Sequence, residues 1–136
     1  MHFRGETTSD LGCNWKFYVE HCLATHEPGM SAEGEEIWSW AWPALIIRHA
    51  QGNAEVQQVI PRSFSRSRVV QYVLAADDAL AATAMQAAQA RIAHAKAACE
   101  NAQQSVEQGL LPAATHALVE AFRARLRDAS AMQPVV

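Results

Sequence analysis

Four side chains of types that bind metals lie close together near the start of the chain. They are Cys13, His21, Cys22 and His26, and the spacing from Cys22 to His26 is similar to half of a zinc site. A second pair at a matching spacing is missing, and in a strand His21 and Cys22 would point to opposite faces. We therefore predict neither a metal site nor a cofactor.

The segment PRSFSRSR, residues 61–68, places three arginines and three serines around Phe64. One interpretation is a helix start in which Ser63 or Ser65 caps the first turn. The other is an anion site, because arginines oppose the dipole at a helix N-terminus while free amides and guanidiniums suit a phosphate. Both stay open, and the candidate residues for binding phosphate or nucleic acid are Arg48, Arg62, Arg66 and Arg68.

A tryptophan stripe is the third candidate. The segment EIWSWAW alternates, which is typical of a strand and puts its three tryptophans on one face. That face either packs under helices or is an exposed surface for a partner. An acidic Gly/Pro-containing loop comes just before it. The predicted partner-binding residues are Trp38, Trp40, Trp42, Glu33, Glu35 and Glu36.

Catalytic motifs are missing from the sequence. It contains no G-x-S-x-G, H-E-x-x-H, phosphate-binding loop or dinucleotide-binding glycine set. The pair His26-Glu27 is weak support for acid–base chemistry. We predict no catalytic residues, and an enzyme would need a site assembled from distant parts of the chain.

The first half of the chain indicates an antiparallel sheet. Residues 14–22, NWKFYVEHC, alternate like a half-buried strand. Gly52-Asn53 lies between two apolar, β-prone runs and predicts a hairpin in which Ile46 faces Val59. With the tryptophan strand, these segments predict three to four strands over about residues 14–60.

The second half changes to a helical period. From Ser65 the apolar positions step by three and four, which predicts a long Ala-rich helix over about 65–108. The competing interpretation makes RVVQYVLA a last strand and uses Asp77 or Asp78 as the cap of a shorter helix. After Gly109, a shorter helix over about 112–129 should return antiparallel to the long one.

Composition bounds the class of protein. The chain has 136 residues, of which 50% are hydrophobic and 18% charged, which argues against wholesale disorder. We predict one α+β domain, 1–136, with a sheet half (1–61) and a helical hairpin half (62–130). A net charge of −3 argues against a generally basic nucleic-acid binder. Three cysteines, no secretory signal and no long apolar run predict a cytoplasmic protein without membrane contact.

These observations favour a non-catalytic protein-interaction module, such as an adaptor, chaperone or inhibitor of bacterial or mobile-element type. A protein partner is expected. A homodimer through the long helix is also expected. The Ala-rich seam of that helix is longer than the shorter helix can cover, so a second copy of the chain could cover the rest. The alternatives are a phosphate or nucleic-acid binder using the arginine patch, and an enzyme with a non-local active site.

Overall fold

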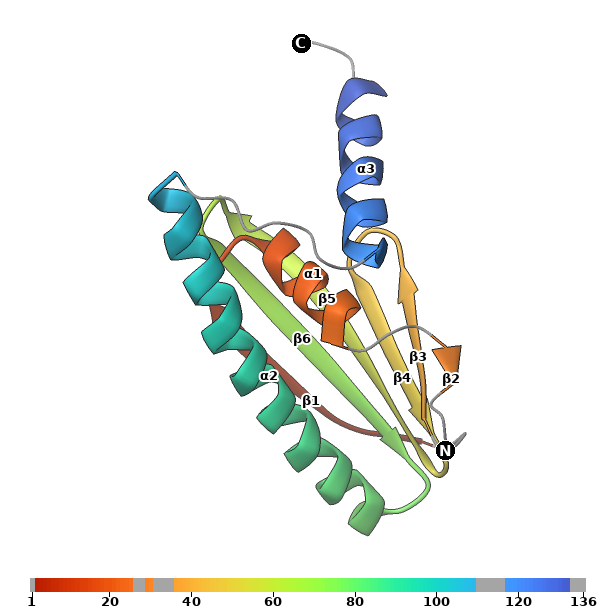
Figure 1. The fold of residues 1–136 in the computed structure, drawn as a ribbon. Helices are drawn as coiled ribbons and strands as arrows, with labels where there is room; N and C mark the ends of the chain where they lie inside the picture. The colour runs from red at the N-terminus through yellow and green to blue at the C-terminus, as the bar shows by residue number, and fades with distance from the viewer. Residues whose placement is uncertain (1, 26–28, 31–35, 110–116, 133–136) are drawn as a thin grey trace.

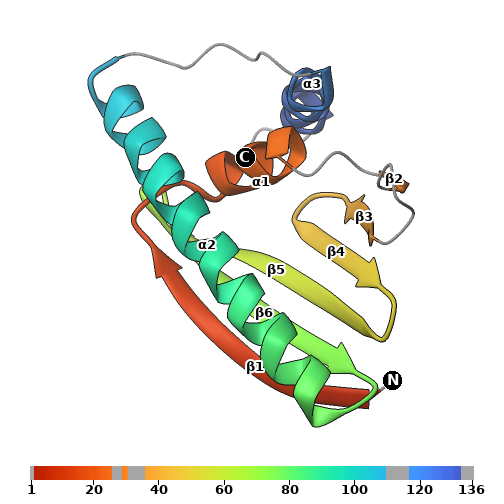
Figure 2. The same cartoon turned by 60° about the horizontal axis from the view of Figure 1, so that its bottom comes forward.

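The computed structural model of the chain describes residues 2–25, 29–30, 36–109 and 117–132. It is an α+β structure in which the described helices lie on the same side of an antiparallel sheet, with α1 and α2 packed on its face (Figures 1 and 2). The elements in chain order are β1 (His2–Leu11), α1 (Trp15–Thr25), β2 (Gly29–Met30), β3 (Glu36–Ala41), β4 (Leu45–Ala50), β5 (Asn53–Ser63), β6 (Arg66–Ala75), α2 (Asp78–Glu107) and α3 (Ala117–Met132).

The sheet has the strand order β1-β6-β5-β4-β3-β2, and every neighbouring pair is antiparallel. Six strands thus lie in the described ranges, and β2 is only two residues long. The predicted count of three to four was wrong because β1, β2 and β6 also join the sheet. The polar sequence of β1 hides its alternation, and β6 also has a helical apolar period.

The segment predicted as a strand at 14–22 is the helix α1, so that prediction was wrong. Its buried residues are Tyr18, Val19, Cys22 and Leu23, which recur at helical spacing. The carboxamide oxygen of Asn14 accepts a hydrogen bond from the backbone amide of Lys16 at 3.1 Å, which helps to begin the helix. Short apolar runs satisfy both periods, and here the helical one fits the packing.

The long helix begins at Asp78 rather than at Ser65. The side chain of Asp77 accepts a hydrogen bond from the amide of Leu80 at 2.8 Å and caps α2. RVVQYVLA lies in β6, so the competing interpretation of this region is the one that holds. The apolar seam is buried at Ala88, Ile92 and Ala95. It packs on β1, β5, β6 and α1, not on a returning helix.

The shorter helix, α3, does not lie along α2 as predicted. Both views place the beginning of α3 beside α1 and away from α2 (Figures 1 and 2). Phe122 is its anchor, being fully buried against the rings of Trp15, Trp40 and Trp42. The aromatic cluster on β3 therefore determines where α3 docks.

The two faces of the sheet differ in cover. The helix-covered face buries Val59, Val69 and Val73 completely or nearly so. On the opposite face Phe3 and Ile37 keep 59% and 37% of their surface exposed, and no described helix covers them. None of the helices in the described ranges combines the length and apolar character needed to cross a lipid bilayer.

Candidate functional site

The tryptophan stripe faces the helices. Trp38 retains 8% of its exposure and belongs to the buried core, and Trp40 and Trp42 pack against it. Trp40 and Trp42 contact each other edge-to-face, with ring centroids 6.0 Å apart. The alternative in which the stripe packs under helices therefore holds. Of the three glutamates predicted as contact residues, Glu33 and Glu35 lie outside the described residues, and Glu36 pairs with Arg48.

A row of four alternating charges crosses the helix-covered face from β3 to α2. Nη1 of Arg48 lies 3.4 Å from Glu36, and Nε of Arg48 lies 3.8 Å from Glu55. Nη2 of Arg91 then donates to both oxygens of Glu55, at 3.0 and 2.9 Å. We call this row the charge chain: Glu36, Arg48, Glu55 and Arg91. The pairing of β4 with β5 places Arg48 directly opposite Glu55, which explains why these two charges are neighbours.

Neutral side chains complete the hydrogen bonding of the central carboxylate. Gln57 donates to Oε1 of Glu55 at 3.3 Å, and Gln71 donates to Oε2 at 2.9 Å. The hydroxyl of Tyr18 donates to Gln57 at 2.5 Å and links α1 to this network. Burial raises the pKa of Tyr18 well above its usual value, so its hydroxyl stays a donor.

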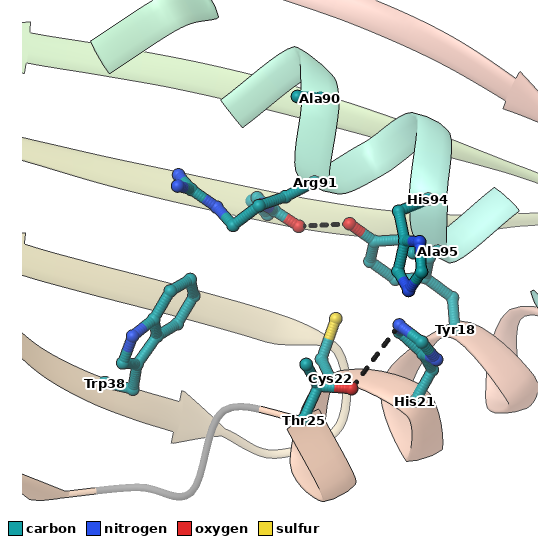
Figure 3. A pocket seen from close by; sticks show the side chains of 10 residues that line it. Tyr18, His21, Cys22, Thr25, Trp38, Ala90, Arg91, His94 and Ala95 are labelled. Carbon is teal, nitrogen blue, oxygen red and sulfur yellow. Dashed lines mark hydrogen bonds between the residues drawn. The ribbon is translucent and has the colours of Figure 1, made fainter. Parts of the chain in front are cut away.

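A cavity of about 260 Å³ opens beside this network, between α1, α2 and β3 (Figure 3). Arg91 and Trp38 lie at one end of it, with the guanidinium carbon 5.6 Å from the indole centroid. His21 and His94 lie at the other end, with ring centroids 6.1 Å apart. The full lining is Tyr18, His21, Cys22, Thr25, Trp38, Gln57, Ala90, Arg91, His94 and Ala95.

Within the described residues, the side chains of metal-binding types do not come together at one place. All three cysteines are buried free thiols, and burial raises the pKa of Cys22 to about 12, which makes its thiol a poor ligand or nucleophile. In the described part of the chain, no three His, Cys, Asp or Glu side chains are arranged to hold a metal ion. His26 and Glu27 lie outside that part.

The four predicted anion-binding arginines lie in two places. Arg48 is 6% exposed and belongs to the charge chain on the helix-covered face. PRSFSRSR is the end of the β5–β6 hairpin rather than a helix start, so no helix dipole acts on its arginines. Arg62 and Arg66 are exposed there, while Arg68 donates to Asp10 at 2.8 Å. The hydrogen bond from Arg68 lowers the pKa of Asp10.

A groove of about 320 Å³ lies beside this hairpin end. It is formed by α1, α3, the last turns of α2 and Phe64, whose side chain is 68% exposed. Its apolar wall consists of Phe17, Phe64, Val106 and Leu126, and its polar rim consists of Asn14, Lys16, Glu20, Arg123 and Arg127.

The rim of the groove is positively charged. Glu20 is its acidic member, and it accepts hydrogen bonds from Arg123 at 2.6 and 3.1 Å. This contact raises the pKa of Arg123 above its usual value and cancels both charges locally. Lys16 and Arg127 therefore determine the net charge of the rim, with Arg62 and Arg66 on the adjoining hairpin.

From the sequence we did not predict that α1 is a helix whose side chains line both the groove and the cavity. Glu20 faces the groove and His21 lines the cavity, so the two features lie on opposite flanks of this helix. A helical period over residues 15–25 was the signal that could have placed them. No protein-family model matches the chain, and no curated protein matches it significantly.

Proposed function

We propose that the chain is a non-catalytic protein-interaction module that binds an acidic, amphipathic segment of a partner protein in the groove beside Phe64. The observation that carries this proposal is the exposed Phe64 ring beside an apolar groove with a cationic rim. An aromatic side chain exposed at a hairpin end is typical of an anchor residue in an interface. An acidic partner would complement Lys16 and Arg127 and would bind faster at low salt.

The role as an adaptor, chaperone or inhibitor follows from occupancy of this groove and needs no catalytic group. The cytoplasmic setting is part of the same proposal and rests on the cysteine content.

The test is affinity capture from a bacterial lysate, with and without nuclease, followed by binding measurements on the captured protein. We expect one protein to be retained in both arms and to be lost with Phe64→Ser. The charge reversal Lys16→Glu together with Arg127→Glu should also weaken it, by about tenfold or more. Leu80→Ser, which changes an exposed leucine in the first turn of α2, is the matched control and should bind like the wild type, because the groove lies at the other end of that helix, beside Val106. A captured protein that binds the Phe64→Ser variant equally well would contradict the groove proposal.

A phosphate or nucleic-acid ligand is the second candidate, and one observation favours it. Arg62 and Arg66 are exposed on either side of Phe64, and arginines interleaved with an aromatic ring suit single-stranded nucleic acid. Retention that is lost with nuclease and with Arg66→Ala would favour this candidate over a protein partner. Its affinity should also fall steeply as salt rises.

Self-association is a further proposal about partners. The seam of α2 on which the homodimer prediction rested is buried against the sheet. We propose instead that two chains associate through the uncovered face of the sheet, where Phe3 and Ile37 are exposed. Partly exposed apolar side chains between them include Ile47, Val56 and Tyr72.

A further inference from the structure

We propose that the cavity between α1, α2 and β3 is a binding site for a small aromatic monocarboxylate. The site is separate from the groove, because the two lie on opposite flanks of α1. Its volume of about 260 Å³ suits a molecule of one or two rings. The proposal therefore stands or falls independently of the protein-binding function.

The anion preference comes from the order of the charge chain. Glu36, Arg48 and Glu55 alternate in sign, and Arg91 is the cation at the end that reaches the cavity. Each inner charge has an opposite charge on both sides. Among the described residues, Arg91 has an opposite charge only on the side of Glu55, so a ligand carboxylate would continue the alternation.

The guanidinium of Arg91 has donor capacity left for such a ligand. Nη2 donates to both oxygens of Glu55. Within the described residues, Nη1 has no hydrogen-bond partner, while the Arg91 side chain keeps 26% of its exposure and lines the cavity. A carboxylate that accepts from a guanidinium forms one of the stronger hydrogen bonds available in proteins.

The body of the ligand would meet aromatic and apolar surface. The indole of Trp38 lies under Arg91, and the methyl groups of Ala90 and Ala95 line the α2 side (Figure 3). The imidazoles of His21 and His94 bound the far end. Flat rings on two sides favour a planar ligand, which stacks or packs edge-on against them.

Binding is tested with benzoate, phenylacetate and indole-3-acetate as probes, each beside its primary amide of nearly equal shape. Isothermal titration calorimetry and thermal unfolding measure affinity and stabilisation. We expect at least one carboxylate to bind at one site per chain, and its amide to bind about tenfold more weakly or worse because it lacks the charge. Equal affinity for acid and amide, or no binding by any of the three acids, would overturn the proposal.

Two matched substitutions on α2 test where the probe binds. Ala90 and Ala93 are both exposed on α2, but only Ala90 lines the cavity. Ala90→Leu should fill the cavity and abolish binding, whereas Ala93→Leu should leave the affinity unchanged. Equal affinity in the two variants would place the probe elsewhere and end the proposal. Neither change alters the charge chain, so both proteins should fold.

Arg91→Lys tests whether the guanidinium of Arg91 binds the carboxylate of the ligand. The variant keeps a cation beside Glu55 but loses the planar fork, and we expect it to bind the carboxylate severalfold more weakly. The affinity for the amide should change less. A loss of equal size for acid and amide would contradict the assigned role of Arg91.

Discussion

Glu55 is the residue on which the buried polar contacts converge. It is 1% exposed and accepts hydrogen bonds from Gln57, Gln71 and Arg91, with Arg48 close by. Such a carboxylate is tolerated because each of its oxygens is satisfied and two guanidiniums balance its charge.

We predict that Glu55→Gln destabilises the protein by about 3 kcal/mol, because it leaves Arg48 and Arg91 without their shared anion. Urea unfolding measures the change. Glu6→Gln on the exposed edge strand is the matched control and should cost less than about 0.5 kcal/mol. Similar losses in the two variants would mean that the charge chain contributes little.

His21 makes stability depend on pH. Burial lowers its pKa from the usual 6.5, and repulsion by His94 lowers it further. The unfolded chain therefore takes up this proton at higher pH than the folded protein does. The neutral His21 ring therefore makes its full contribution to the free energy of unfolding above about pH 6.5. This contribution is lost as the pH falls through the lower pKa of His21 in the folded protein.

We expect the free energy of unfolding to fall between about pH 7.5 and pH 5 in the wild type, and to fall less in His21→Gln. Urea denaturation at a series of pH values gives both curves. His49→Gln, which changes an exposed histidine of β4 on the other face of the sheet, is the control and should follow the wild type. Parallel curves for the wild type and His21→Gln would contradict the predicted role.

At the scale of elements, the start of α2 depends on one cap. Asp77→Ala removes the acceptor for the amide of Leu80 and should destabilise the protein by about 1 kcal/mol. Gln86→Ala, at an exposed position within the same helix, should be neutral or slightly stabilising. If Asp77→Ala unfolds at the same urea concentration as the wild type, the helix does not depend on this cap.

The position of α3 depends on Phe122. Its ring is fully buried, with centroids 5.5 to 5.9 Å from the rings of three tryptophans. We predict that Phe122→Ala costs about 3–5 kcal/mol, or detaches α3 and removes part of the near-ultraviolet circular dichroism. Glu120→Ala on the exposed side of α3 is the control. An unchanged spectrum together with unchanged stability would contradict this docking.

Sequence periodicity predicted the elements whose two faces differ strongly. The tryptophan strand and the turn at Gly52, which has a positive φ of 82°, are confirmed. The predicted register of that hairpin was two residues off, since Ile46 lies opposite Gln57 rather than Val59. A shift by two keeps every side chain on its face, so hydrophobic pattern alone does not distinguish the two registers.

The regions that were wrongly predicted are those where two periods coexist or where partners are distant. Residues 66–75 fit a helical seam as well as a strand, and pairing with β1 and β5 decides in favour of the strand. The candidate site likewise depends on contacts between residues that are distant in sequence. Arg48 was predicted as part of a surface patch, and only the strand register places it beside Glu55 in the interior.

At the scale of the whole molecule, one face of the sheet is covered by the described helices and the other is not, which predicts that two chains associate through the uncovered face. We expect light scattering at micromolar concentration to give a mass near twice 14.9 kDa. Ile37→Lys on the uncovered face should give the single-chain mass, because it places a charge in the interface. Ala82→Lys on the exposed side of α2 is the control and should remain a dimer. A single-chain mass for the wild type would contradict this prediction.

The pairing of β1 with β6 also has a consequence for how the protein forms during synthesis. The hydroxyl of Thr7 donates to Gln71, a partner 64 residues further along the chain. On the ribosome, β1 therefore emerges long before the strand that it pairs with. The β4–β5 and β5–β6 hairpins can close locally and early, whereas the β1 edge must wait for a long loop to close. Until then the nascent chain keeps an open strand edge along β6, the stage at which a ribosome-associated chaperone would be needed most.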